Sequence, residues 1–287
     1  GKMILYYRNK FIAALLTVVI TLSSMPFTAK AEKKASGIYQ CDWFDESLYY
    51  PYDYDDGWFS GDSYEYNHKL ALLALNISMA SFNSFNKDDR SENIRAMLEN
   101  CGFKTKSYGY GTEGYDTAAV EMARKTVTKN GESCTVVIAA IRSGNYGMEW
   151  GGNMRIGSGE NHLGFDIAKE TVLNYINDYF ADEKISGRVK LLIPGYSRGG
   201  SIANLVGAEL DDGSYRDSLK RADNIKNISL AKNDIYVYTF EAPQCTKKSG
   251  ADGKIYGNII NIMNPNDYVP KFVMKDWGFT HYGVEYY

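Results

Sequence analysis

Residues 191–201 read LLIPGYSRGGS, an apolar run that stops at a proline and leads into a serine enclosed by glycines. The serine is Ser197, and the glycines beside it are Gly195 and Gly199. The apolar run indicates a buried strand, and the segment that follows, SIANLVGAEL, has the apolar spacing of a helix. A serine between a strand and a helix in a G-x-S-x-G turn predicts a nucleophile elbow, which holds the hydroxyl clear of the end of the sheet.

The glycines of this turn have a physical purpose. Gly195 and Gly199 lack side chains, so the strand and the helix can approach each other closely. The helix that begins after Ser197 offers the positive end of its dipole, and the backbone N–H of Arg198 could donate to an oxyanion. The alternative interpretation is a tight glycine–serine turn without chemistry.

A serine nucleophile needs a base, and the base needs an acid that orients it. In a strand–serine–helix context the order along the chain is serine, then aspartate or glutamate, then histidine. Asp267 follows the apolar segment NIINIMN and is the predicted acid, with Asn266 and Asp234 as nearby polar alternatives. Asp267 could instead be a turn residue ahead of Pro270.

Buried strands alternate with helices along the second half of the chain. Continuous apolar runs at 135–142, 189–195, 234–243 and 258–264 predict strands that are buried on both faces. The apolar spacing of 165–180 predicts a long helix between the first two of them. This alternation predicts an α/β fold with a mainly parallel sheet flanked by helices.

The region ahead of the first buried strand is predicted to be mostly helical. Apolar spacing predicts a helix within 63–81 and a second one that begins near Ser91 and stops at Gly102. A third helix is predicted over DTAAVEMARKTV, residues 116–127. Residues 32–61 are rich in tyrosine and aspartate, and we predict an irregular arm that packs on the domain surface or contacts a carbohydrate.

The composition is that of a globular protein with a sizeable core. Of the 287 residues, 44% are hydrophobic and 23% are charged. The net charge of −3 offers no global basic field for nucleic acid, so no nucleic-acid partner is expected. No metal-binding motif is found, and no cofactor is expected. Four cysteines, Cys41, Cys101, Cys134 and Cys245, are spaced unlike zinc ligands; Cys134 opens an apolar run and is predicted to be a buried thiol.

The first 31 residues are predicted to be a signal peptide. Lys2, Arg8 and Lys10 precede the apolar stretch FIAALLTVVITL, and Ala29 and Ala31 form an A-x-A cleavage pattern. The stretch is shorter than the ~20 residues that a membrane span needs. We therefore predict a secreted or cell-surface protein, in which disulfides are permitted but their pairing cannot be derived from spacing. An uncleaved N-terminal anchor is the alternative.

An ordered set of short motifs resembles the class 3 lipases and their bacterial relatives. AIRSGNYGMEW is similar to the family's F-R-G-[ST] strand end, and HLGF to its H-x-G-F. GYSRGG resembles G-H-S-x-G-G, YTFEAP resembles T-F-G-x-P, and NDYVP resembles N-D-x-V-P. The resemblance covers residues 62–287 and implies an α/β-hydrolase fold and hydrolysis of carboxylic esters, with acyl lipids as substrates and peripheral contact with a lipid surface.

The resemblance also implies roles for individual residues. Ser197 would be the nucleophile and Asp267 the triad acid. A second oxyanion donor would come from Ser143 or Gly144, but here R-S-G replaces the family's R-G-[ST], so Gly144 offers only a backbone N–H. Two other functions stay open: a peptidase or acyltransferase on the same fold, and a noncatalytic binding protein.

The chain has three histidines, and their assignment decides the triad. His68 is predicted to be a surface or packing residue, and His162, in the H-x-G-F motif, to make structural hydrogen bonds. His281 is the only histidine after Asp267 and is therefore the candidate base by chain order. Its segment GFTHYGVEYY resembles a family strand whose histidine is not catalytic. We therefore expect a truncated chain whose base lies beyond Tyr287, with His281 as the alternative.

Overall fold

The computed structural model describes residues 33–43, 46–83, 85–86, 88–111, 114, 117–143, 153, 155–213, 228–266, 275 and 277–287. The predicted signal peptide, Gly144 and Asp267 lie outside these residues. Among the described helices, none has the length and apolarity that crossing a membrane requires.

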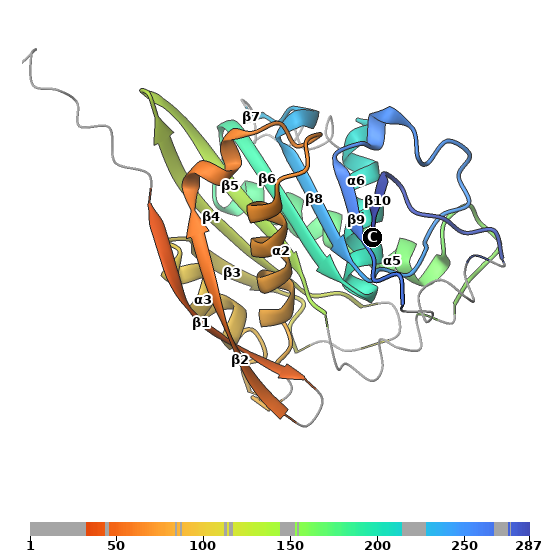
Figure 1. Ribbon diagram of the computed structural model, residues 1–287, viewed down its shortest axis with the longest axis horizontal. Helices are drawn as coiled ribbons and strands as arrows, with labels where there is room; N and C mark the ends of the chain where they lie inside the picture. Colours follow the sequence, from red (N-terminus) through yellow and green to blue (C-terminus); the bar gives the residue numbers. More distant parts are fainter. Residues whose placement is uncertain are drawn as a thin grey trace, which may run out of the picture.

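A sheet of eight strands forms the centre of the described structure, in the order β10-β9-β8-β6-β5-β4-β3, with β7 beside β6 (Figure 1). The pairs from β5 to β10 are parallel, whereas β3–β4 and β4–β5 are antiparallel. The predicted, mainly parallel sheet is thus confirmed. The strands are β3 (Lys104–Tyr108), β4 (Val120–Lys129), β5 (Glu132–Ile141), β6 (Gly187–Tyr196), β7 (Ile228–Ser229), β8 (Ile235–Phe240), β9 (Ile259–Ile262) and β10 (Val284–Tyr286).

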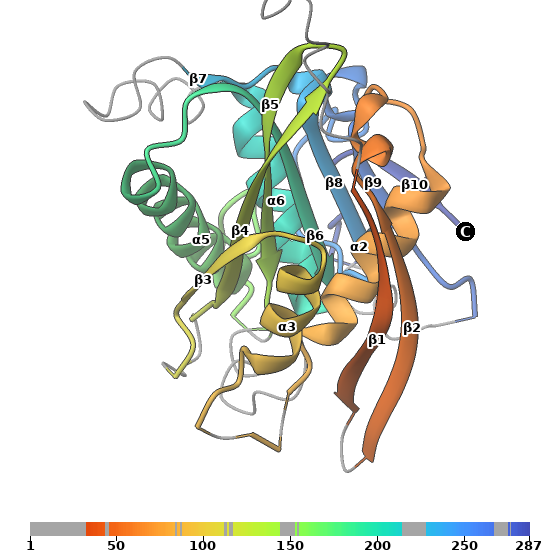
Figure 2. The same ribbon diagram turned by 90° about the vertical axis from the view of Figure 1, so that its left-hand side faces the viewer.

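Helices and a hairpin cover the two faces of this sheet (Figures 1 and 2). One face carries α5 (Leu163–Asp182) and α6 (Arg198–Asp212), and the other carries α2 (His68–Ala80) and α3 (Glu92–Asn100). The hairpin of β1 (Lys34–Trp43) and β2 (Glu46–Asp55) packs against α2 and α3 on that second face. The sheet therefore lies between two layers and separates two apolar cores.

The central strands divide their side chains between the two cores. In β5, Val137 and Ile141 belong to the core under α5 and α6, whereas Ile138 faces the core under α2 and α3. In β6, Leu191 faces the first core and Leu192 the second. Because both of their faces are buried, such strands have continuous apolar sequences. These apolar runs are the pattern from which the strands were predicted.

The segment 116–127 was predicted to be helical, and this prediction is wrong, because β4 occupies Val120–Lys129. The strand pairs with β5 through a turn at Asn130 and Gly131, which have φ angles of 51° and 81°. Asn-Gly is the residue pair that favours a tight hairpin turn with positive φ at both positions. The K-N-G-E sequence was thus the local indication of a hairpin that the helical spacing obscured.

The prediction of an irregular arm over 32–61 is also wrong, because most of it is the β1–β2 hairpin. Tyr52 and Tyr54 point inward and are buried, whereas Tyr49 points outward and is exposed. This alternation has the period of two that a half-buried strand requires. The short 3-10 helix Asp56–Ser60 (η1) follows, capped by Asp55, whose carboxylate accepts the N–H of Gly57 at 2.8 Å.

All four cysteines are free thiols in this structure. Cys41, Cys101 and Cys245 are buried, and burial raises the pKa of the Cys41 and Cys101 thiols to about 12. Cys134 is half-buried rather than fully buried, because its position in β5 lies near the turn of the β4–β5 hairpin.

Candidate active site

Ser197 lies at the sharp turn between the end of β6 and the start of α6. Its φ of 52° and ψ of −124° place a non-glycine residue in a sparsely populated region of backbone conformation. Its N–H donates to the Phe240 carbonyl of β8 at 2.8 Å, and its carbonyl accepts the Ser201 N–H at 3.1 Å. Such strain costs about 1–3 kcal/mol and persists only where surrounding contacts impose it. The half-buried Ser197 thus has the strand–turn–helix context that the sequence predicted.

Three glycines make the turn possible because neighbouring atoms occupy the space that a side chain would need. A Cβ on Gly195 would come within 2.3 Å of the Gly199 carbonyl oxygen. A Cβ on Gly199 would lie 2.7 Å from the Ser143 hydroxyl, and one on Gly200 would lie 2.9 Å from the Ala242 side chain. The sequence singled out Gly195 and Gly199 for this close approach, but it missed Gly200.

The end of β5 lies next to the turn and carries Arg142 and Ser143, both buried. The Ser143 N–H donates to the Ser81 hydroxyl at 2.9 Å, and the Ser143 hydroxyl accepts the Tyr196 N–H at 3.1 Å. The Ser143 amide is therefore bonded to α2 rather than directed at the turn. Gly144, the other predicted donor, lies outside the described residues.

Arg198 is the first residue of α6 and directly follows Ser197. The amides of a first helical turn do not bond within their own helix, and the helix dipole favours negative charge near them. The Arg198 N–H is thus in the kind of position from which a backbone amide can stabilise an oxyanion on a substrate held at Ser197.

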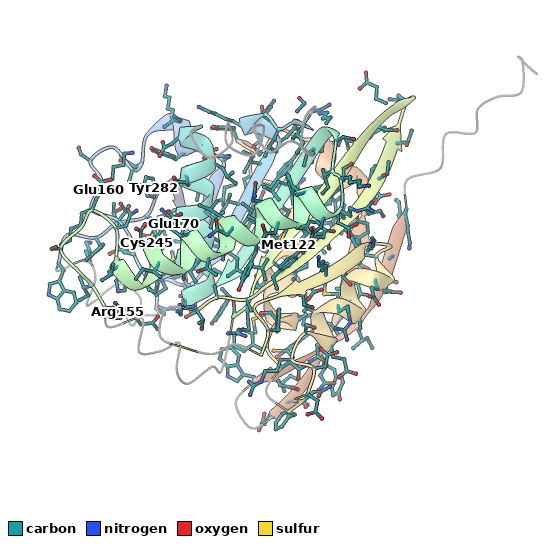
Figure 3. The ribbon with its side chains drawn as sticks, turned by 180° about the vertical axis from the view of Figure 1, so that it is seen from behind. Met122, Arg155, Glu160, Glu170, Cys245 and Tyr282 are labelled. Carbon is teal, nitrogen blue, oxygen red and sulfur yellow. The ribbon has the colours of Figure 1, made fainter. Side chains whose placement is uncertain are left out.

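A buried polar network fixes α6 to β9 and to the segment that precedes β10. The Asn204 side chain donates to Asn261 and to the Tyr282 carbonyl, both at 2.9 Å. Its amide oxygen accepts the Tyr282 N–H at 3.1 Å and the Cys245 thiol at 3.3 Å. Figure 3 shows Cys245 and Tyr282 near the same end of the molecule. Fully satisfied buried networks of this kind hold a helix in one position.

The predicted acid, Asp267, lies outside the described residues, but the strand before it is described. β9 lies two strands from β6, parallel to it, so both strands end at the same edge of the sheet. Asn266, one of the alternatives, is exposed beyond β9. Asp234, the other alternative, precedes β8 at the opposite edge and pairs with Arg188. The structure therefore separates Asp234 from Ser197.

His281 is buried and both of its ring nitrogens have partners. Nε2 lies 2.7 Å from the Ala242 carbonyl oxygen, and Nδ1 lies 2.7 Å from a carboxylate oxygen of Glu285. The Ala242 carbonyl oxygen can only accept a hydrogen bond, so Nε2 is the nitrogen that donates to it. These contacts join the segment after β8 to β10, and no hydrogen bond links His281 to Ser197 in the described structure.

His162 and His68 lie elsewhere. His162 caps α5: its Nδ1 accepts the Phe165 N–H at 3.4 Å, and its Nε2 lies 2.9 Å from the Asn153 carbonyl oxygen. Burial lowers the pKa of His162, which agrees with a neutral ring that donates from Nε2 only. His68 is exposed at the start of α2, with Nδ1 3.1 Å from the Tyr66 hydroxyl.

The N-terminal hairpin reaches the serine turn through an aromatic contact that the sequence did not reveal. Trp43, at the end of β1, packs against Phe82 and Tyr196, with ring centroids 5.0 and 6.1 Å away. Phe82 and Tyr196 are themselves 5.8 Å apart. These residues are far apart along the chain, so no local pattern could have predicted that they meet.

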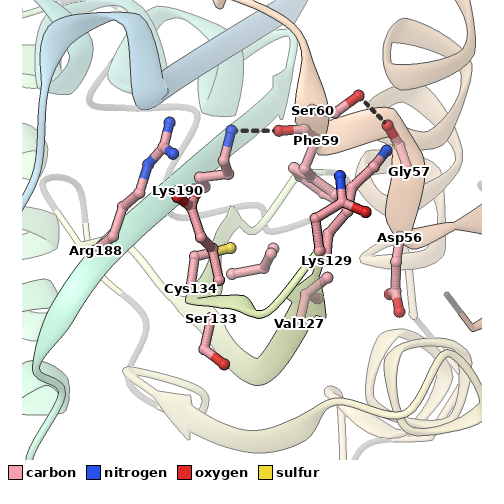
Figure 4. A pocket seen from close by; sticks show the side chains of 13 residues that line it. Asp56, Gly57, Phe59, Ser60, Val127, Lys129, Ser133, Cys134, Arg188 and Lys190 are labelled. Carbon is pink, nitrogen blue, oxygen red and sulfur yellow. Dashed lines mark hydrogen bonds between the residues drawn. The ribbon is translucent and has the colours of Figure 1, made fainter. Parts of the chain in front are cut away.

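A pocket of about 660 Å³ lies at the other end of β6 (Figure 4). Arg188 and Lys190 of β6, the β4–β5 hairpin and η1 line it, and no residue of the serine turn does. Within the described part of the chain, no group of three or more histidine, cysteine, aspartate or glutamate residues is arranged to hold a metal ion.

Solved structures of lipases are similar to this chain at the level of the fold. A fungal lipase–inhibitor complex is 16% identical and aligns over 77% of this chain and 81% of its own, with a TM-score of 0.51. The triacylglyceride lipase of Rhizomucor miehei is 17% identical over the same shares, with a TM-score of 0.48. At such low identity the first of these likenesses shows the fold alone, which is the α/β-hydrolase fold. No curated protein matches the chain significantly.

A family model for "Lipase (class 3)" matches residues 112–277. The matched segment contains the end of β5, the serine turn and β9. Because it covers more than half of the 287 residues, the protein belongs to the class 3 lipase family.

Proposed function

We propose that the protein hydrolyses carboxylic esters of acyl lipids through an acyl-enzyme formed on Ser197. Its family makes it a lipase-type ester hydrolase; the proposal adds the nucleophile, the substrate class and the mechanism. The observation that carries it is the strained backbone of Ser197, with φ at 52°, at the N-terminus of α6. Strain of this kind is concentrated at functional sites.

The proposed reaction proceeds in two acyl transfers. The Ser197 hydroxyl attacks the ester carbonyl carbon while an imidazole takes its proton. The Arg198 N–H and an amide of the loop after Ser143, with Gly144 the candidate, stabilise the oxyanion. The alcohol leaves with the proton from the imidazole. A water molecule then attacks the acyl-enzyme and releases the carboxylic acid and the free serine, and Asp267 orients the imidazole throughout.

The proton acceptor in this proposal has two candidates. His281 would have to release its bond to the Ala242 carbonyl or to Glu285 before it could accept a proton from Ser197. The family resemblance instead places the catalytic histidine after the strand that contains His281. The two candidates are separated by experiment, because only the first requires His281.

A fluorophosphonate probe tests the proposal, since it reacts with activated serines. We expect labelling that disappears in Ser197→Ala and persists in Ser229→Ala, an exposed serine of β7 beside the amino end of β6. Labelling of the chain that ends at Tyr287, lost in His281→Asn, would assign the base to His281. Labelling only of a longer chain that includes residues after Tyr287 would assign the base to those residues. Absence of labelling in both forms would refute serine hydrolysis.

A substrate panel tests the proposed class of ester. p-Nitrophenyl esters of increasing acyl length should be hydrolysed, and peptide amides should not. Cleavage of amides instead of esters would identify a peptidase on the same fold. Activity that rises when an ester substrate forms an emulsion would support contact with a lipid surface.

We also propose that the protein is exported, on the basis of residues 1–31. N-terminal sequencing of the protein recovered outside the producing cells should begin just after Ala31. Recovery of only the uncleaved chain in the membrane fraction would instead identify an N-terminal anchor.

A further inference from the structure

A chain of buried hydrogen bonds connects the end of α2 to the serine turn. The Tyr196 N–H donates to the Ser143 hydroxyl at 3.1 Å, and the Ser143 N–H donates to the Ser81 hydroxyl at 2.9 Å. The Ser81 hydroxyl in turn donates to the Ser78 carbonyl at 2.6 Å. Ser81 is fully buried and Ser143 nearly so. The residue that precedes the nucleophile is therefore linked to a helix in a different part of the chain.

Ser143 fills the space between the end of β5 and the serine turn. Its hydroxyl lies 2.7 Å from the point that a Cβ on Gly199 would occupy. The family pattern R-G-[ST] has a glycine at this position, so this chain adds a hydroxyl where the pattern has no side chain. That hydroxyl accepts the Tyr196 amide at 3.1 Å.

The Ser143 amide is engaged by Ser81 and not by the site. An amide that already donates to a buried hydroxyl cannot also stabilise an oxyanion without giving up that bond. The bond instead fixes the point from which the loop after β5 departs.

We propose that Ser81 and Ser143 are positioning residues that hold Tyr196, the residue before the nucleophile, and so fix the serine turn in the geometry that places the Ser197 hydroxyl beside the Arg198 amide. The proposal rests on Ser197 being the nucleophile. A displacement of about 1 Å in such a turn can lower a rate by about a hundredfold, because oxyanion stabilisation depends on geometry.

Ser81→Ala tests the proposal, and Ser78→Ala is its matched control. Both serines are buried at the end of α2, but the Ser78 hydroxyl donates within its own helix, to the Ala74 carbonyl at 2.9 Å. For p-nitrophenyl butyrate we expect kcat to fall by about tenfold to a hundredfold in Ser81→Ala, with KM within about twofold. Both constants should stay within about twofold of wild type in Ser78→Ala.

Ser143→Ala removes the acceptor of the Tyr196 amide and should also lower kcat more than KM. The double variant Ser81→Ala/Ser143→Ala should lose less than the product of the two single losses, because both substitutions break one chain of bonds. Losses that multiply fully would show that the two serines act independently and would contradict the proposal.

Hydrogen exchange gives a readout that does not need activity. Peptides that contain Ser143 and Tyr196 should exchange at least about fivefold faster in Ser81→Ala than in wild type, and be unchanged in Ser78→Ala. If the two variants exchange and turn over alike, the proposal is overturned. If the wild-type protein is never labelled at Ser197, the proposed function fails, and the catalytic part of this inference fails with it. The exchange data would still decide whether Ser81 holds the serine turn.

Discussion

Strand β6 has a different construction at each of its ends. At its carboxyl end, Gly195 and Ser197 form a turn in which backbone packs against backbone and φ is strained. At its amino end, Arg188 and Lys190 line an open pocket of about 660 Å³ (Figure 4) and pair with Asp234. The end with close packing contains the candidate nucleophile, and the end with the described pocket contains ion pairs.

The comparison teaches that pocket volume and cationic charge do not by themselves mark a site. The Lys190 ammonium already contacts the Phe59 carbonyl at 2.5 Å, the Tyr236 hydroxyl at 3.3 Å and Asp234 at 3.2 Å. Its three donors therefore have protein partners. At the carboxyl end, by contrast, the backbone strain at Ser197 does not add to stability. Strained residues of this kind cluster at functional sites.

The largest expected effect comes from a methyl group at the serine turn. Gly195→Ala should cost at least about 3 kcal/mol and abolish labelling, because the new Cβ meets the Gly199 carbonyl at 2.3 Å and backbone cannot move aside easily. Gly187→Ala, at the amino end of the same strand, has no atom within 4 Å and should cost only about 1 kcal/mol, for its φ of 71°. Urea unfolding and probe labelling measure both, and equal costs would contradict the contrast between the two ends.

Much of the fold could be predicted from the sequence because buried parallel strands have an unmistakable pattern. The runs that became β5, β6, β8 and β9 are apolar on both faces, and α5 has regular helical spacing. The errors were at the β1–β2 hairpin and at β4, in which only residues 120–123 are fully buried. In β4, the apolar positions of 118–123 suit a helix as well as a strand, and only pairing with β5 decides between them.

The candidate site could be predicted where it depends on local sequence and not where it depends on tertiary contacts. Ser197 and its glycines form one continuous turn, so the G-x-S-x-G pattern contained the necessary information. Ser81 and Trp43 reach the turn from distant parts of the chain, and nothing in their own sequence neighbourhood indicates it. The contacts of His281 depend likewise on Ala242 and Glu285 being brought to it by the fold.

A second prediction concerns a buried carboxylate near the carboxyl end of the sheet. Glu121 in β4 is fully buried; the Ser107 hydroxyl donates to one of its oxygens at 2.5 Å, and the other has no partner among the described residues. Burial raises its pKa from 4.5 to about 7. At the other edge of the sheet, the buried carboxylate of Asp234 is paired with two cations, Arg188 and Lys190. The two ends of the sheet therefore differ in how a buried carboxylate is stabilised.

The sign of the effect follows from the direction of this shift. Between pH 4.5 and about 7 the native Glu121 keeps a proton that the unfolded chain has lost. Stability therefore falls as pH rises through this window, by up to about 3 kcal/mol. Glu121→Gln should remove this part of the pH dependence, so its stability relative to wild type should grow from pH 5 to pH 8. A constant difference in urea unfolding across this range would contradict the prediction.

A third prediction tests whether the amino end of β6 has only a structural role. Lys190→Met should lower stability by about 2 kcal/mol, because Phe59, Tyr236 and Asp234 each lose a charged donor. The loss is smaller than for a fully isolated buried charge, since Asp234 keeps Arg188. The labelling rate of Ser197 should be unchanged. Slower labelling of the folded protein would show that the two ends of the strand are coupled.

The smallest expected effect is that of the more exposed partner. Arg188 holds Asp234 with two bonds of 3.0 and 3.1 Å, but half of its side chain is exposed to solvent. Exposed pairs contribute less than about 1 kcal/mol and are screened by salt. Arg188→Gln should therefore cost less than Lys190→Met, and its cost should shrink further when unfolding is measured in 1 M NaCl instead of 0.05 M. If Arg188→Gln costs more than Lys190→Met, then Arg188, and not the buried lysine, contributes most of the stabilisation of Asp234.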